Sequence, residues 1–111
     1  MQGKEMHDKA VEQVKDIFSD CKCLKHCNLG GVQPDLTCIC SPEPVAIIEV
    51  ETPKSLQRRH TKNQVLLLSR YAEEGNDQFA IAVSDGTNVC GIPLNDEGKK
   101  LLRERKINAC E

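Results

Sequence analysis

The segment over residues 45–52 constrains the fold of this chain more than any other. It reads Val-Ala-Ile-Ile-Glu-Val-Glu-Thr, a nearly continuous run of β-branched and apolar residues. Such a run is typical of a strand that is buried on both faces. Two acids, Glu49 and Glu51, interrupt the apolar pattern. Because burying an unpaired charge is costly, these acids need an explanation beyond packing.

Periodicity predicts an α/β chain around this strand, in the order helix, strand, strand, helix, strand, helix. The predicted helices cover residues 5–19, 56–74 and about 95–106. The predicted strands cover residues 36–40, 45–52 and 78–84, with a further short strand near 23–25. Ser41 to Pro44 is predicted to be a turn, since two prolines do not fit a paired central strand. Ser55 is the expected N-cap of the middle helix, Gly75 its C′ residue, and Asn95 or Asp96 the cap of the last helix.

Length and composition limit the function classes. The 111 residues predict a single domain over 1–111, and 39% hydrophobic with 29% charged residues is typical of a globular chain. No apolar run approaches the roughly 20 residues that span a bilayer, so no membrane partner is expected. The net charge of −2 excludes a strongly basic nucleic-acid binder but not a local basic patch. The polar first ten residues do not resemble a secretory signal, which favours the cytoplasm.

Three carboxylates are predicted to meet at one end of the sheet. Glu49 and Glu51 are two residues apart on a strand, so their side chains leave the same face, while Val50 points the other way. A hairpin across residues 41–44 can place Asp35 beside Glu49. Like charges about 4 Å apart repel by about 4 kcal/mol at an effective dielectric of ~20. A hard divalent cation would offset this repulsion, although strand-end acids can also simply face solvent.

The order of these motifs resembles the PD-(D/E)XK nuclease superfamily, which has the restriction-endonuclease-like fold. Pro34-Asp35 is followed, after about a dozen residues, by Ile47-Ile48-Glu49-Val50-Glu51. The resemblance extends from the first helix to the strand that ends near Ser84. It implies a small mixed β-sheet with flanking helices. It also implies that Asp35 and Glu49 hold Mg²⁺ or Mn²⁺, with help from the Val50 carbonyl.

The third motif position departs from the superfamily, because Glu51 stands where a lysine is usual. The resemblance implies that this E-x-E variant uses Glu51 to orient or deprotonate the attacking water. Lys54 is the nearest lysine that could take over the missing charge. The alternative for Lys54 is a solvated residue at the start of a helix.

The middle helix carries two further features. Gln64 and Tyr71 are seven residues apart and share one helical face, which is similar to the Gln…Tyr motif of RecB-like members. There the Gln supports the metal site and the Tyr lies toward DNA; the alternative is ordinary half-buried packing. Three positive charges at the helix start are suited to phosphate contacts, or to a solvated face. These charges are Arg58, Arg59 and Lys62.

Seven cysteines are present, an odd number. Without an export signal, reduced or buried thiols are expected ahead of disulfides. Cys21, Cys23 and Cys27 form a C-x-C-x₃-C pattern that could hold structural zinc or an iron–sulfur cluster, but only the Cys23–Cys27 spacing suits zinc. A first-helix Glu near the metal is common in the superfamily, but Glu5 and Glu12 lie opposite the apolar stripe of that helix, which is formed by Met6, Ala10, Val14 and Ile17. His7 lies beside the stripe and is expected to be a packed or surface residue.

The sequence therefore predicts a metal-dependent nuclease that hydrolyses phosphodiester bonds in DNA or RNA, DNA being favoured. So small a nuclease would need a homodimer or a partner for sequence specificity. Two alternatives remain open. One is a non-catalytic nucleic-acid or protein-binding module on the same fold, which the missing lysine favours. The other is a cysteine-rich metal-binding protein.

Overall fold

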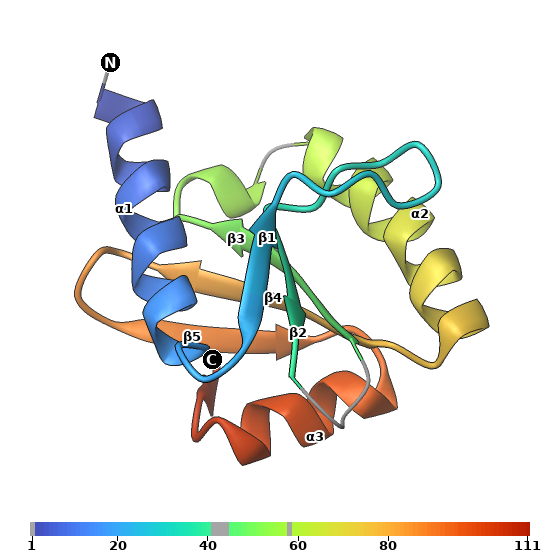
Figure 1. The fold of residues 1–111 in the computed structure, drawn as a ribbon. Helices are drawn as coiled ribbons and strands as arrows, with labels where there is room; N and C mark the ends of the chain where they lie inside the picture. Colours follow the sequence, from blue (N-terminus) through green and yellow to red (C-terminus); the bar gives the residue numbers. More distant parts are fainter. Residues whose placement is uncertain (1, 41–44, 58) are drawn as a thin grey trace.

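The computed structural model of the chain describes residues 2–40, 45–57 and 59–111, and the side chains of residues 2, 3 and 57–62 lie outside this description. Its helices are α1 (Gln2–Ile17), the 3₁₀ turn η1 (Ser55–Gln57), α2 (Arg59–Gly75) and α3 (Asp96–Glu104). Its strands are β1 (Lys22–Lys25), β2 (Leu36–Ile39), β3 (Val45–Glu51), β4 (Gln78–Ser84), β5 (Val89–Pro93) and β6 (Asn108–Ala109). Figure 1 shows the helices packed around a central sheet.

The described strands form one mixed sheet in the order β1-β2-β3-β4-β5-β6. The pairs β1–β2, β2–β3 and β4–β5 are antiparallel, whereas β3–β4 and β5–β6 are parallel. The parallel step from β3 to β4 is connected by α2, as a crossover requires. The predicted hairpin between residues 36–40 and 45–52 and the predicted short strand near residue 23 are both confirmed.

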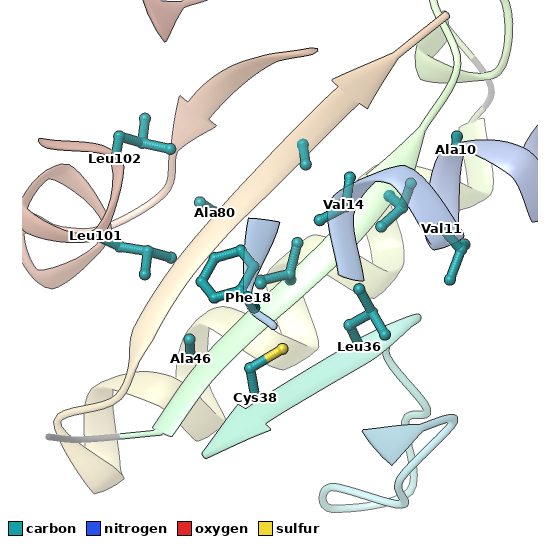
Figure 2. Close-up of a cluster of buried hydrophobic side chains, with 13 residues drawn as sticks. Ala10, Val11, Val14, Phe18, Leu36, Cys38, Ala46, Ala80, Leu101 and Leu102 are labelled. Carbon is teal, nitrogen blue, oxygen red and sulfur yellow. The ribbon is translucent and has the colours of Figure 1, made fainter. Parts of the chain in front are cut away.

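Two apolar clusters, one on each face, bury the sheet. Ala10 and Val14 of α1 and Phe18, which directly follows α1, pack with Ile48 and Val50 of β3 on one face. Leu101 and Leu102 of α3 also contribute to this cluster (Figure 2). Leu68 of α2 packs with Ile47 of β3 and Phe79 of β4 on the other face. Because side chains alternate along a strand, β3 supplies both clusters, and six of its seven residues are buried. The expectation of a strand buried on both faces is confirmed.

Two strands and two helix boundaries differ from the sequence prediction. β5 and β6 were not predicted, because Gly91 and Pro93 interrupt the pattern of β5 and β6 has two residues. Ser55 does not cap α2: its hydroxyl accepts from the Thr52 N–H within the turn before η1, and α2 begins only at Arg59. Helix α2 ends with Gly75 inside it, and Asn76 takes the left-handed conformation with φ 55°.

The expectation of reduced cysteines and of a metal site at Cys21, Cys23 and Cys27 is wrong for this structure. Cys21 is disulfide-bonded to Cys40 and Cys23 to Cys38, while Cys90 pairs with Cys110 and Cys27 is a free thiol. The β1–β2 register places Cys23 directly opposite Cys38, with their Cα atoms 4.0 Å apart. Antiparallel pairing therefore decided the partners, and linear spacing could not show it.

Candidate active site

The candidate site lies where β3 extends beyond the end of its neighbour β2. The β2–β3 ladder begins at the Leu36–Ile48 pair, so the following residues of β3 have no β2 partner on that side. On the other side, β4 pairs with β3 as far as Glu51. Pro34, which precedes Asp35, has no N–H with which to extend the ladder. The backbone groups of Val50 on this edge must therefore find other partners.

Asp35 supplies one of those partners and links the two strands. The Val50 N–H donates to Asp35 Oδ2 over 2.8 Å. In return, the Asp35 N–H donates to Glu49 Oε1 over 3.1 Å. These reciprocal bonds hold Asp35 beside Glu49, as the hairpin predicts. The Asp35 side chain is 15% exposed, so one edge of its carboxylate can still be reached from outside.

Glu49 is a buried acid, and among the described side chains no Lys, Arg or His forms an ion pair with it. It is 2% exposed. Its pKa is raised to about 8, mainly by burial and also by the charges of Asp35 and Glu51, while the hydrogen bond from the Asp35 N–H and the charge of His7 oppose this rise. Glu49 thus sits in a negative environment that an added cation would relieve. Its side chain leaves the same face of β3 as Ile47, the face that α2 covers.

Glu51 is also buried, at 7% exposure, and it is held by the turn that follows β3. The Ser55 hydroxyl donates to Glu51 Oε2. Ser55 in turn receives an N–H from Thr52 and donates its own N–H to the Thr52 hydroxyl. The turn thereby orients Glu51, and the two acids of β3 are neither splayed into solvent nor directed to different faces.

His7 is a site residue that sequence reasoning missed. Its Nε2 lies 3.0 Å from the Val50 carbonyl oxygen and 3.4 Å from Asp35 Oδ1. The hydrogen bond to Asp35 and the Asp35 charge raise its pKa to about 9, against the lowering effect of burial. The missed signal was that His7 is one turn before Ala10 and Val11, which face the core. Glu5 and Glu12 are exposed, as expected, and Glu12 pairs with Lys25.

The donors on this edge suit a hard divalent ion. Carboxylate and carbonyl oxygens are the ligands that Mg²⁺ and Mn²⁺ prefer, and Mg²⁺ needs only one or two carboxylates because it keeps several waters. Within residues 2–40, 45–57 and 59–111, no three His, Cys, Asp or Glu side chains form a ready-made metal cluster. The Val50 carbonyl therefore matters, because it adds a main-chain donor beside Asp35. The buried, unneutralised Glu49 is the observation that favours a cation here.

The other predicted residues lie around this edge with varied accessibility. Lys54 is exposed in the turn after β3, and Gln64 is half-buried on α2. Tyr71 is 38% exposed and its ring lies against Gly30 in the loop before β2. Three predicted phosphate-binding residues lie wholly or partly outside the described part of the chain. Arg58 is not described at all, and the side chains of Arg59 and Lys62 are not described.

Comparison with known proteins bears on the fold alone. No protein-family model matches the chain, and no curated protein matches its sequence. Its structure is similar to that of Hjc, a Holliday junction resolvase from Archaeoglobus fulgidus, with a TM-score of 0.54 over 85% of this chain and 74% of Hjc. The two sequences are 12% identical. The mixed α/β, restriction-endonuclease-like fold predicted from the sequence is thus confirmed.

Proposed function

We propose that this protein is a nuclease that hydrolyses phosphodiester bonds in DNA with the aid of Mg²⁺ or Mn²⁺. The observation that carries the proposal is the linked arrangement of Asp35, Glu49 and the Val50 backbone at the unpaired edge of β3. A buried acid such as Glu49, which lies near the charges of other carboxylates, lowers the stability of a fold unless a proton or a cation compensates it. The likeness of the fold to a Holliday junction resolvase supports the same conclusion.

Each site residue has a proposed role. Asp35, Glu49 and the Val50 carbonyl would hold the ion, which would lower the pKa of water enough to supply hydroxide for attack on a phosphodiester at neutral pH. Glu51, which the Ser55 hydroxyl orients, would position that water and accept its proton. Lys54 would stabilise charge on the phosphate, and Gln64 on α2 would support the site. These two assignments rest on the position of each residue in the chain and on the superfamily resemblance.

The proposed DNA contacts come from α2 and from Arg58, which precedes it in the sequence. Arg58, Arg59 and Lys62 would bind backbone phosphates, and Tyr71, which is 38% exposed, would face the nucleic acid. A homodimer stays a prediction: Leu66 and Leu67 of α2 are 65% and 54% exposed, an apolar area that a second copy could cover.

A cytoplasmic location also stays a prediction. The three disulfides argue against this prediction, because disulfides are rare in the reducing cytoplasm. Within the described helices, none combines the length and the apolar character needed to cross a bilayer.

The proposal is tested by incubating the protein with labelled duplex, four-way junction, single-stranded DNA and RNA in the presence of Mg²⁺ or Mn²⁺. We expect cleavage that chelation abolishes and that Asp35→Asn reduces by at least a hundredfold. The matched control is Asp77→Asn, because Asp77 is also half-buried but precedes β4 at the opposite end of the sheet. That variant should keep wild-type cleavage.

Binding without cleavage would instead favour the non-catalytic module. That outcome requires wild-type protein that binds DNA with a steep salt dependence, shows no turnover with either ion, and gives no metal-induced amide shifts near residues 35 and 49. The same NMR titration separates the two functions, because the nuclease requires metal-induced shifts at these positions and the module does not.

A further inference from the structure

Arg105 follows α3, and its side chain is directed onto the Cys21–Cys40 disulfide. One guanidinium nitrogen, Nη2, is 3.0 Å from Cys21 Sγ and 3.4 Å from Cys40 Sγ. Within the described residues, neither of the other two disulfides receives a hydrogen bond from a cationic side chain. A disulfide sulfur is a weak hydrogen-bond acceptor, so the guanidinium gains little from the oxidised bond. Its position suits the thiolate that forms when this bond is broken.

Three contacts hold the guanidinium of Arg105 beside the sulfurs. Its Nη1 donates to the Asp20 carboxylate, and its Cζ lies 4.8 Å from the centre of the buried Phe18 ring. The turn after Phe18 is closed by the Cys21 N–H, which donates to the Phe18 carbonyl oxygen over 2.9 Å. The Arg105 side chain is 19% exposed and that of Asp20 is 66% exposed, so solvent screens the carboxylate more than the guanidinium. A fixed positive charge therefore remains next to the disulfide.

The two disulfides between β1 and β2 differ in their place on the strand ladder. Cys23 and Cys38 are paired inside it, and Cys38 is fully buried. Cys21 and Cys40 lie just beyond the end of the ladder, and both are half-buried. A small thiol can therefore reach the outer disulfide, while the inner one keeps the two strands in register after the outer bond is broken.

We propose that the Cys21–Cys40 disulfide is a site of thiol–disulfide exchange with a low-molecular-weight thiol, and that Arg105 stabilises the thiolate that leaves. The site lies at the opposite end of β2 to Asp35, and the inference does not depend on the proposed function. A neighbouring guanidinium favours a cysteine thiolate, and a better stabilised thiolate leaves a disulfide faster.

The exchange consists of two balanced displacements. A thiolate of the small thiol attacks Cys40 Sγ, the S–S bond breaks, and its electron pair leaves on Cys21 Sγ, the sulfur nearer to Arg105. Cys40 then forms a mixed disulfide with the small thiol. A second molecule of the thiol attacks the small-molecule sulfur of that mixed disulfide and releases Cys40. Two small thiols are thereby oxidised to one disulfide, and the two cysteines take up their electrons and protons.

The direct test is differential alkylation of the full chain, treated without oxygen with reduced glutathione. Thiols that are freed at successive times are trapped with iodoacetamide and located by peptide mass spectrometry. Cys90–Cys110 is the internal comparison, because its cysteines are also half-buried and its sequence separation is 20 residues against 19. We expect Cys21 to be freed at least about fivefold faster than Cys90, with glutathione attached to Cys40 at early times. Equal rates, or a chain in which Cys21 is not bonded to Cys40, would overturn the proposal.

Variants assign the effect to the guanidinium. Arg105→Gln removes the charge and should slow the release of Cys21 about fivefold, whereas Arg105→Lys should restore part of the rate. Arg103→Gln is the matched control, because it removes the same charge from an exposed position on α3 and should leave the rate unchanged. If Arg105→Gln and Arg103→Gln release Cys21 at the same rate, the role given to Arg105 is wrong. Circular dichroism verifies that each variant is folded.

A second measurement separates thiolate stabilisation from access to the disulfide, which Arg105→Gln would also change. Replacing Cys40 and Cys27 by serine leaves Cys21 as the free thiol while the other two disulfides stay closed. Its rate of alkylation at neutral pH reports the thiolate fraction and should fall about fivefold when Arg105→Gln is added. An unchanged rate would show that the guanidinium does not stabilise this thiolate, and the proposal would then be wrong.

Discussion

Replacing Glu49 by Gln should stabilise the metal-free protein at alkaline pH while destroying its metal site. Glu49 is almost fully buried, and its pKa is raised to about 8 from an ordinary value of 4.5. The folded state therefore binds a proton more tightly than the unfolded state. Between these two pH values the free energy of unfolding falls as pH rises, because the unfolded chain ionises Glu49 without penalty.

The size of this effect follows from the shift itself. Each pKa unit corresponds to about 1.4 kcal/mol, so the ionised group costs the fold roughly 5 kcal/mol at most above pH 8. The cost is about 3 kcal/mol at pH 7 and under about 1 kcal/mol at pH 5. Gln removes this cost but buries an amide, which carries a penalty of about 1–3 kcal/mol that does not depend on pH.

Urea unfolding in the presence of a chelator, from pH 5 to pH 9, measures the difference between Glu49→Gln and wild type. We expect the free energy of unfolding of the variant, relative to that of wild type, to increase by about 3 kcal/mol between pH 5 and pH 8. Glu104→Gln is the matched control, since this glutamate is exposed on α3 and its difference should stay flat. A difference for Glu49→Gln that does not change with pH would refute the argument that the site carries an uncompensated buried charge.

Three further predictions concern stability. Thr37→Val should stabilise the fold by about 1 kcal/mol in urea unfolding, because the buried Thr37 hydroxyl has no hydrogen-bond partner in the described structure; a loss would show that the hydroxyl is in fact satisfied. Gly98→Ala should cost about 3 kcal/mol, because its Cβ would lie 2.1 Å from the Phe79 carbonyl oxygen; an unchanged Tm would contradict this close approach. Because the pKa of His7 is raised to about 9, the protonated imidazole stabilises the fold. This contribution to the free energy of unfolding is complete below pH 6.5 and is lost as the pH rises through 9. Allowing for its one-third exposure, His7→Gln should therefore cost about 1–2 kcal/mol at pH 6 and little at pH 10; equal losses at both would argue against the ion pair.

Much of the fold could be predicted because its signals are local. The apolar run of β3 and the helical stripe of Met6, Ala10, Val14 and Ile17 each carry their own periodicity. Both elements form, although α1 covers Gln2–Ile17 rather than residues 5–19 and Met6 is 50% exposed. The sequence could also predict that Asp35 lies beside Glu49, because a four-residue turn allows few registers for the hairpin. β5 was not predicted because Gly91 and Pro93 interrupt its apolar pattern, and the segment forms a strand by pairing with β4.

What the sequence determined by itself is the burial of β3, the hairpin beside it and the two acids on one face. Alternation along a strand and a short connection permit few other outcomes. Only the tertiary structure decided that His7 meets Val50, 43 residues away, and that Cys23 pairs with Cys38. Those contacts join separate elements, so they depend on how helices and strands pack rather than on any pattern within one of them.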